Sequence, residues 1–179
     1  MFSGQRIHVL GSSGAGKTTF ARAIAQRLDI PHWEMDAIFW QPDWQYLSVE
    51  EFRATLEQKL AADAWVVDGN YRRVRDILWS RADTVVFLDY PFWLSSGRLL
   101  RRSWTRGLRQ QELWAGNHES LRRSFFSRDS ILLYTLKCHY RKRRQNLADL
   151  QDPAYAHLRV QIFRWPRQAE RWLASLRPL

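Results

Sequence analysis

The chain has 179 residues, of which 45% are hydrophobic and 26% are charged. A chain of this size and composition can bury a core without disulfides, and it is neither disordered nor membrane-spanning in character. Its single cysteine, Cys138, excludes an intramolecular disulfide and a cysteine-based zinc site. We therefore expect one cytoplasmic domain over residues 1–179, with no membrane partner.

The excess positive charge is confined to one segment. Residues 98–144 hold 13 of the 28 lysines and arginines but three of the 18 acidic residues, so they account for the whole net charge of +10. Such asymmetry favours a polyanionic partner, either nucleotide phosphates or a nucleic acid. The basic run at 141–144 cannot all point one way on a helix, so we expect it to be mostly solvated.

Apolar strand-like runs alternate with helical patterns along the chain. In chain order we expect a strand at 6–10, a helix at 17–28, a strand at 32–35, a helix at 49–62, a strand at 65–67, a helix at 71–79, a strand at 84–88, helices at 92–104 and 121–147, a strand at 158–163 and a helix at 166–176. This alternation predicts an α/β fold with a parallel sheet and helices on both faces.

Four residues with chemical potential directly follow the predicted strands. These residues are Gly11, Asp36, Asp68 and Asp89. Ligands of such sheets bind at the carboxyl ends of the strands, so all four are expected along one edge. We expect Asp89 to cap the next helix rather than to join the site.

Residues 11–18 match the pattern G-x-x-x-x-G-K-[ST] in full, between a predicted strand and a predicted helix. Small residues let such a loop wrap around an anion while its backbone N–H groups point inward. Lys17 is expected to reach the β- and γ-phosphates of ATP, and the Thr18 hydroxyl is expected to bind Mg²⁺. The expected nucleotide-binding residues are Gly11, Ser12, Ser13, Gly14, Ala15, Gly16, Lys17, Thr18 and Thr19.

Two carboxylates are candidates for the chemistry itself. Asp68 stands where an acid would hold Mg²⁺, usually through a water, although it could instead form an Asx turn before Gly69. Asp36 has three open roles: to activate or orient an acceptor hydroxyl, to help hold Mg²⁺, or to cap the following turn.

Arginines and tryptophans supply further candidates. Arg98, Arg102 and Arg106 are spaced four apart on a predicted helix, so they share a face that could clamp a transferring phosphoryl group or simply be solvated. Trp40 and Trp44 lie in an irregular loop after Asp36. They suit either a stacking platform for a base or sugar, or the core.

Several segments together resemble a known family. They are the loop GSSGAGKTT, the segments WEMDAIFW and WVVDGNYRR, and VVFLDYP followed by RLLRR. In combination they resemble the adenylate-kinase-like P-loop proteins called DNA topology modulation proteins, over nearly the whole chain. The resemblance implies a three-layer P-loop NTPase fold, with a five-stranded parallel sheet in the order 2-3-1-4-5 and an arginine-rich lid at about 98–144.

The resemblance also implies roles for individual residues. Arg72 takes the place of the arginine that binds the acceptor phosphate in the D-G-F-P-R motif of nucleoside-monophosphate kinases, although Asn70 and Tyr71 here replace the Phe-Pro pair. Arg98 and Arg102 take the places of two lid arginines. The loop at 164–167 is implied to lie near the adenine.

We therefore expect a Mg²⁺-dependent nucleotide or small-molecule kinase that transfers the γ-phosphoryl group of ATP to an acceptor. The alternative is an ATP-switched, nucleic-acid-associated protein that modulates DNA topology through the basic segment, and a third possibility is a plain ATPase. The expected catalytic residues are Lys17, Asp36, Arg98 and Arg102; the acceptor-binding residues are Asp36, Trp40 and Arg72; the metal ligands are Thr18 and Asp68.

Overall fold

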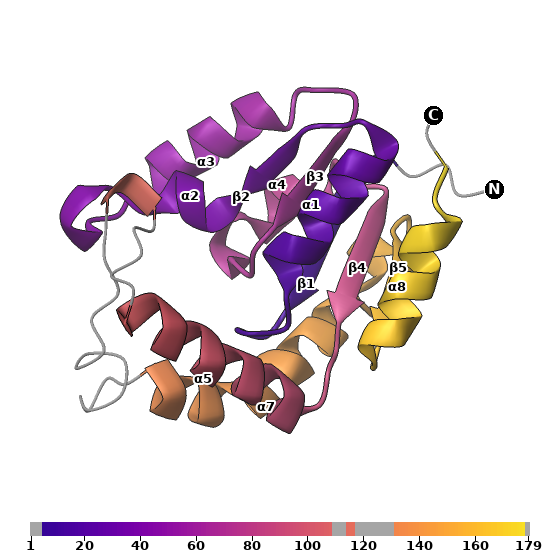
Figure 1. Cartoon of the computed structure of the whole chain (residues 1–179). Helices are drawn as coiled ribbons and strands as arrows, with labels where there is room; N and C mark the ends of the chain where they lie inside the picture. Colours follow the sequence, from indigo (N-terminus) through magenta and orange to yellow (C-terminus); the bar gives the residue numbers. More distant parts are fainter. Residues whose placement is uncertain (1–4, 109–113, 117–130, 178–179) are drawn as a thin grey trace.

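Five parallel strands form one sheet in the order β2-β3-β1-β4-β5 in the computed structural model (Figure 1). The strands are β1 (Arg6–Gly11), β2 (His32–Glu34), β3 (Trp65–Asp68), β4 (Thr84–Leu88) and β5 (Arg159–Phe163). The structure describes residues 5–108, 114–116 and 131–177, without the side chains of 106–108 and 131–138. The predicted α/β class and strand order are both confirmed.

Seven helices and four short 3₁₀ turns surround the sheet in the described part of the chain. The helices are α1 (Lys17–Leu28), α2 (Met35–Phe39), α3 (Val49–Lys59), α4 (Arg75–Trp79), α5 (Phe92–Leu108), α7 (Ile131–Asp149) and α8 (Pro166–Ser175). The 3₁₀ turns are Pro42–Trp44, Arg72–Val74, Trp114–Gly116 and Pro153–Tyr155.

The predicted elements agree with the described part of the structure, with two differences in element type. The expected helix at 71–79 divides into a 3₁₀ turn and α4. The stretch after β2, predicted to be irregular, contains α2. Residues 121–130 of the expected helix at 121–147 lie outside the described residues.

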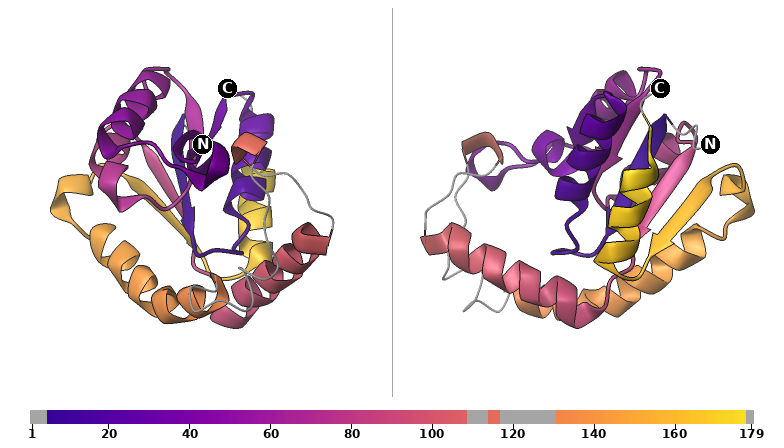
Figure 2. Two further views of the ribbon diagram at one scale, coloured as in Figure 1. Left: turned by 90° about the vertical axis from the view of Figure 1, so that its left-hand side faces the viewer. Right: turned by 45° about the vertical axis from the view of Figure 1, so that its right-hand side comes forward.

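Helices lie on both faces of the sheet (Figure 2). Alternating side chains of the strands build two cores, one on each face. Ile7 and Val9 of β1 pack with α1 and α8, whereas Leu10 lies in the cluster that contains residues of α3 and α4. Because both faces are covered, the central strands are apolar on both sides. The carboxyl edge of the sheet is then the part left for ligands.

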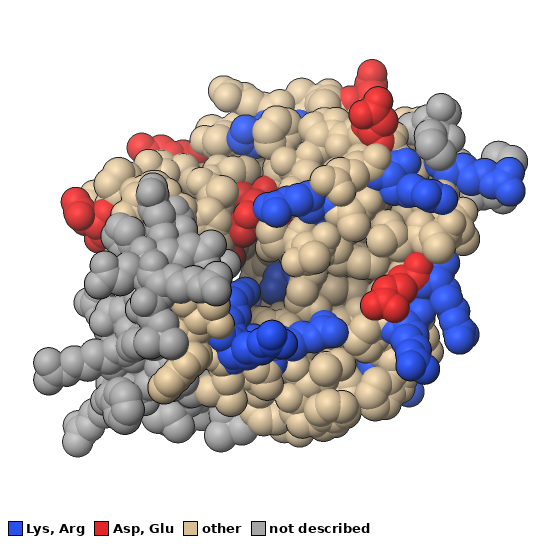
Figure 3. All heavy atoms as spheres, viewed as in Figure 1, with Lys and Arg blue, Asp and Glu red and all other residues tan. Residues whose placement is uncertain are grey.

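Helices α5 and α7 lie beyond that edge, below the end of β4 in Figure 1. Helix α5 lies close to the loop that follows β1, since a Cβ placed on Gly14 would lie 2.1 Å from the carbonyl oxygen of Ser95 in α5. The face shown in Figure 3 is hollowed between the region of α1 and the region of α5, and basic side chains gather around this hollow.

A buried histidine ties β1 to the loop after β3. Trp79 Nε1 donates to His8 Nδ1 at 2.8 Å, which leaves His8 Nε2 to donate to the carbonyl oxygen of Gly69 at 3.1 Å. Burial, followed by the charge of Arg75, lowers the pKa of His8 to about 3. The ring is therefore neutral, as these two hydrogen bonds require.

This histidine makes stability depend on pH. Between pH 6.5 and about 3 the unfolded chain binds a proton at His8 that the folded chain does not, so the free energy of unfolding falls as the pH falls through this range. The slope from this residue approaches about 1.4 kcal/mol per pH unit.

Urea unfolding of the wild type and of His8→Gln at several pH values checks this. Glutamine does not titrate, so its curve lacks this part of the slope. Parallel pH dependences of the two proteins would contradict the assignment.

Candidate active site

The register of the parallel sheet brings polar residues to one edge. Val9 of β1 and Glu34 of β2 both pair with Asp68, the last residue of β3. Gly11 ends β1 and opens the loop, and Asp89 directly follows β4, the other neighbour of β1. The edge therefore combines a glycine-rich turn with several carboxylates.

The loop before α1 has the conformation of an anion cradle. Gly14 and Gly16 adopt left-handed φ angles of 82° and 88°, which only glycine adopts without strain. Helix α1 begins at Lys17 with no side-chain cap, so its first amides remain for another acceptor. The Ser12 hydroxyl oxygen is buried and has no hydrogen-bond partner among the described residues.

Lys17 lies over this loop, where its Nζ donates to the carbonyl oxygen of Ser12 at 3.2 Å. Loss of hydration lowers the pKa of Lys17, against the opposing effect of the Asp36 and Asp68 carboxylates. Arg102 and Lys142 add to the lowering, which places these two positive charges near Lys17. Positively and negatively charged side chains therefore meet at this loop.

Thr18 and Asp68 form the pair expected to hold a metal. Thr18 Oγ1 donates to Asp68 Oδ2 at 2.7 Å, and His32 Nε2 lies 2.7 Å from the other Asp68 oxygen. In the described ranges, no group of three or more His, Cys, Asp or Glu side chains could hold a metal by itself. A hydroxyl and a carboxylate nevertheless fit Mg²⁺, which is commonly held by one or two carboxylates together with substrate phosphates.

Glu34 is a neighbour of this pair that sequence reasoning missed. Its Oε1 is 3.4 Å from Thr18 Oγ1. Burial raises the pKa of Glu34, and the charges of Asp68 and Asp36 raise it further. Three carboxylates therefore gather on the β2–β3 side of the loop.

Asp36 lies in the first turn of α2, where Tyr71 holds it. The Tyr71 hydroxyl donates to Asp36 Oδ1 at 2.5 Å. The Tyr71 ring packs against Phe39 and Phe52, with ring centroids 5.0 Å and 5.2 Å away. The sequence analysis did not identify Tyr71 as a site residue, because a tyrosine at this position gives no sequence signal of a functional role.

Trp40 and Trp44 meet edge to face, with ring centroids 5.4 Å apart. Trp40 also contacts Phe39 and Tyr46, so it belongs to an aromatic cluster beside α2. This position fits both roles considered from the sequence, and acceptor binding by Trp40 stays a prediction.

Arg98 and Arg102 extend from α5 towards the loop. A Cβ placed on Gly16 would lie 3.9 Å from Arg98 Nη1, and the Arg98 guanidinium is 5.8 Å from the centroid of the Tyr90 ring. Arg102 acts electrostatically on Lys17. The side chain of Arg106, the third residue of the predicted face, lies outside the described residues.

Arg72 is bound to α7. It donates through Nε and Nη2 to the two oxygens of Asp149, at 3.1 Å and 3.0 Å. Asp149 also pairs with the buried Arg75, whose Nη2 donates to Asn70 Oδ1 at 3.0 Å and to Asn146 at 2.8 Å. The acceptor-phosphate role implied for Arg72 stays a prediction.

Asp89 does not cap a helix, so that prediction is wrong. Both of its oxygens accept from Arg143 of α7, at 2.6 Å and 2.7 Å, and Pro91 instead accepts the first amides of α5. In the run at 141–144, predicted to be mostly solvated, Arg141 and Arg144 are exposed, whereas Arg143 is partly buried by this ion pair. The negative charge of the buried Asp89 holds the Arg143 side chain at the end of β4.

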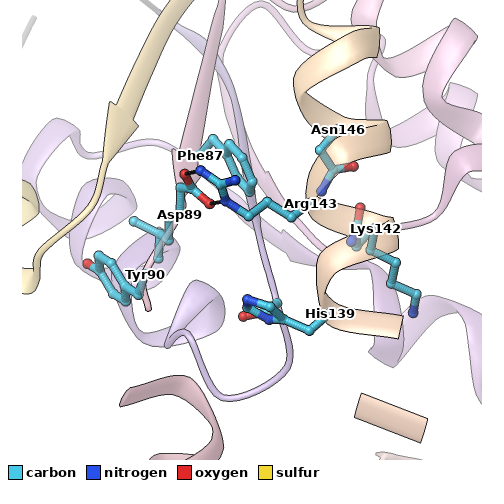
Figure 4. A pocket seen from close by; sticks show the side chains of 10 residues that line it. Phe87, Asp89, Tyr90, His139, Lys142, Arg143 and Asn146 are labelled. Atoms are coloured by element: carbon cyan, nitrogen blue, oxygen red, sulfur yellow. Dashed lines mark hydrogen bonds and ion pairs between the residues drawn. The ribbon is translucent and has the colours of Figure 1, made fainter. Parts of the chain in front are cut away.

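This ion pair lies at a small pocket that also reaches the phosphate loop (Figure 4). The α7 side chains approach the pocket opposite the end of β4. Its lining residues are Ser12, Asn70, Phe87, Leu88, Asp89, Tyr90, His139, Lys142, Arg143 and Asn146. The pocket is therefore shared by α7, the loop at 11–18, the segment after β3 and the end of β4.

The fold is shared with solved structures of kinases. The chain resembles the crystal structures of a gluconokinase from Sinorhizobium meliloti 1021 (TM-score 0.52, 22% identity, 95% of this chain and 91% of that one) and a shikimate kinase from Bacteroides thetaiotaomicron (0.54, 16%, 96% and 96%). A shikimate kinase from Aquifex aeolicus is similar at a TM-score of 0.53 and 16% identity, over 94% and 91% of the two chains.

Among curated proteins, the chain is 33% identical over 104 residues to the uncharacterised protein YqaC of Bacillus subtilis (strain 168). The match covers 57% of this chain and 58% of that protein's length. No protein-family model matches the chain. The resemblance to DNA topology modulation proteins is not confirmed. None of the described helices is long and apolar enough to cross a bilayer.

The close approach of Gly14 to α5 predicts the effect of adding one methyl group. In Gly14→Ala the new Cβ meets the Ser95 carbonyl, and the φ angle is unfavourable, so we expect a loss of about 2 kcal/mol or more in the free energy of unfolding.

Gly97→Ala is the matched control, because a Cβ there has no atom within 4 Å. In the interior of α5 this change should stabilise the protein by roughly 0.5–1 kcal/mol. Chemical denaturation of both variants checks the pair. Equal changes in the free energy of unfolding for the two variants would contradict the close contact between Gly14 and Ser95.

Proposed function

We propose that the protein is a Mg²⁺-dependent kinase that transfers the γ-phosphoryl group of ATP to a small acceptor. The observation that carries the proposal is the loop at 11–18, which combines left-handed glycines, an uncapped helix start, Lys17 and a buried, unpartnered Ser12 hydroxyl. The shared fold of gluconokinase and shikimate kinases supports it. Neither kinase's substrate is carried over.

Each group of site residues has a proposed role that follows from its chemistry. Loop amides and Lys17 bind the phosphate oxygens and offset their charge. Thr18 and Asp68 would hold Mg²⁺, which when bound supplies positive charge to the β- and γ-phosphates. The Asp36 carboxylate acts electrostatically on Lys17 and is a candidate to receive the acceptor.

Arg98 and Arg102 are proposed to act on the transferring group. Both project from α5 near the loop, where a guanidinium stabilises negative charge that spreads over the phosphoryl oxygens in the transition state. Residues 98–144 are proposed as the lid of a single domain that excludes water from the donor, although 109–113 and 117–130 lie outside the described residues.

The alternative, an ATP-switched protein on nucleic acid, is less favoured. The structural likeness is to kinases, and Arg143 of the basic segment is engaged by Asp89. Binding to a DNA duplex with a steep salt dependence would restore this alternative. Phosphate release without any acceptor would indicate a plain ATPase.

Lys17→Ala tests nucleotide binding. We expect at least about a 100-fold weaker affinity for Mg-ATP, because a charge-assisted contact to two phosphates is lost. Isothermal titration calorimetry measures it, with unfolding curves as a check on the fold. The control is Lys59→Ala, whose ammonium lies 4.0 Å over the Trp33 ring, away from the loop. Unchanged ATP affinity in Lys17→Ala would refute the proposal.

The double variant Arg98→Ala/Arg102→Ala separates catalysis from binding. An arginine that acts on the transferring phosphoryl group contributes roughly 10³–10⁵ to the rate. We therefore expect kcat to fall by about 10³-fold or more while the Kd of ATP changes less than about tenfold. Arg101→Ala, an exposed arginine of the same helix, is the control. Equal losses in kcat and ATP affinity would contradict a clamp on the transition state.

A further inference from the structure

We propose that the acceptor group is a hydroxyl, and that Tyr71 is the positioning residue that holds Asp36 as the base for this hydroxyl. The inference rests on the proposed kinase function and adds to it the chemical class of the acceptor. It also decides among the three roles that the sequence leaves open for Asp36.

One carboxylate oxygen of Asp36 accepts a hydrogen bond from Tyr71, and the other is available to a ligand. An ionised carboxylate only accepts hydrogen bonds, so the Tyr71 phenol must be the donor in the 2.5 Å contact to Oδ1. Burial, together with the Asp36 charge, raises the pKa of Tyr71 well above its usual value, so the phenol keeps its proton. Asp36 Oδ2 is then the atom left for the acceptor.

The position of the Tyr71 ring is itself determined by packing. Its ring lies against Phe39, which belongs to the same short helix as Asp36, and against Phe52 of α3. Aromatic pairs at these distances resist rotation of the ring because the neighbouring rings fill the space. The phenol is thus a rigid donor, and the carboxylate that it binds has one preferred orientation.

The electrostatics of this corner favour a neutral acceptor group. Glu34 precedes Asp36 by two positions, and Thr18 Oγ1 lies 3.4 Å from Glu34 Oε1 and 2.7 Å from Asp68 Oδ2, so three carboxylates lie close together here. A phosphate brought to Asp36 would add negative charge to three carboxylates. The arginine implied to bind such a phosphate, Arg72, is held by Asp149. A hydroxyl carries no charge and offers the proton that a carboxylate accepts.

The step balances without a further reactant. The acceptor O–H proton moves to Asp36 Oδ2 as the acceptor oxygen forms a bond to the γ-phosphorus. The bond from that phosphorus to the β–γ bridging oxygen breaks, and its electron pair leaves with ADP. The product is a phosphate monoester, and Asp36 later returns its proton to water.

The first test is the chemical class of the product. The wild type is incubated with Mg-ATP and either hydroxyl compounds without phosphate (ribonucleosides, gluconate, shikimate, glycerol) or nucleoside monophosphates. ³¹P NMR distinguishes a monoester from a phosphoanhydride. We expect a monoester. A nucleoside diphosphate as the product, or no transfer and no ATP hydrolysis despite normal ATP binding, would overturn the inference and leave nucleotide binding standing.

The second test is a double-mutant cycle with Tyr71→Phe and Asp36→Asn, assayed with the best hydroxyl acceptor or, if hydrolysis alone is detected, with water in its place. We expect Tyr71→Phe to lower kcat by about 10-fold or more with little change in the KM of ATP, and Asp36→Asn to lower it by roughly 10²–10⁴. If Tyr71 acts through Asp36, adding Tyr71→Phe to Asp36→Asn causes no further loss.

The control is Tyr155→Phe, a half-buried tyrosine packed on Trp79, which should leave kcat unchanged. Fully additive losses in the cycle would mean that Tyr71 has only a structural role, and this would overturn its assignment. Failure of the wild type to bind Mg-ATP would instead overturn the proposed function.

Discussion

The parallel pairing of β1 with β3 and β4 is the constraint on which the rest of the site depends. Because Val9 pairs with Asp68 and Gly11 with Leu88, the loop at 11–18 emerges between two acidic strand ends. A shift of one residue would turn the side chains of β1 to the opposite faces of the sheet and disrupt both cores. The same apolar packing that stabilises the sheet therefore sets the distance between the loop and its carboxylates.

Sequence patterns were sufficient to predict the strands and the glycine-rich loop, and the family resemblance supplied the strand order. The three central strands, β1, β3 and β4, are short apolar runs buried on both faces, so their positions are visible without the structure. The loop is recognisable because glycines, a lysine and a hydroxyl must stand at fixed spacing to surround an anion. Thr18 and Asp68 were predicted as metal ligands, a role that is untested. In the structure Thr18 Oγ1 and Asp68 Oδ2 lie 2.7 Å apart.

The partners of the predicted site residues could not be read from the sequence. Tyr71 and Asp36, Arg72 and Asp149, and Arg143 and Asp89 are each separated by more than 30 positions and meet through packing of helices around the carboxyl edge. Asp89 looked like a helix cap because it precedes Tyr90-Pro91. Its burial beside α7 makes an arginine the stronger partner, since a buried carboxylate needs an opposite charge.

A crystal structure with a non-hydrolysable ATP analogue and Mg²⁺ tests the central claim most directly. The account predicts the triphosphate inside the loop at 11–18, within hydrogen-bond distance of Lys17 and the Ser12 hydroxyl, with the metal beside Thr18 and Asp68. A nucleotide bound elsewhere on the molecule, with the Ser12 hydroxyl still unpartnered, would contradict it.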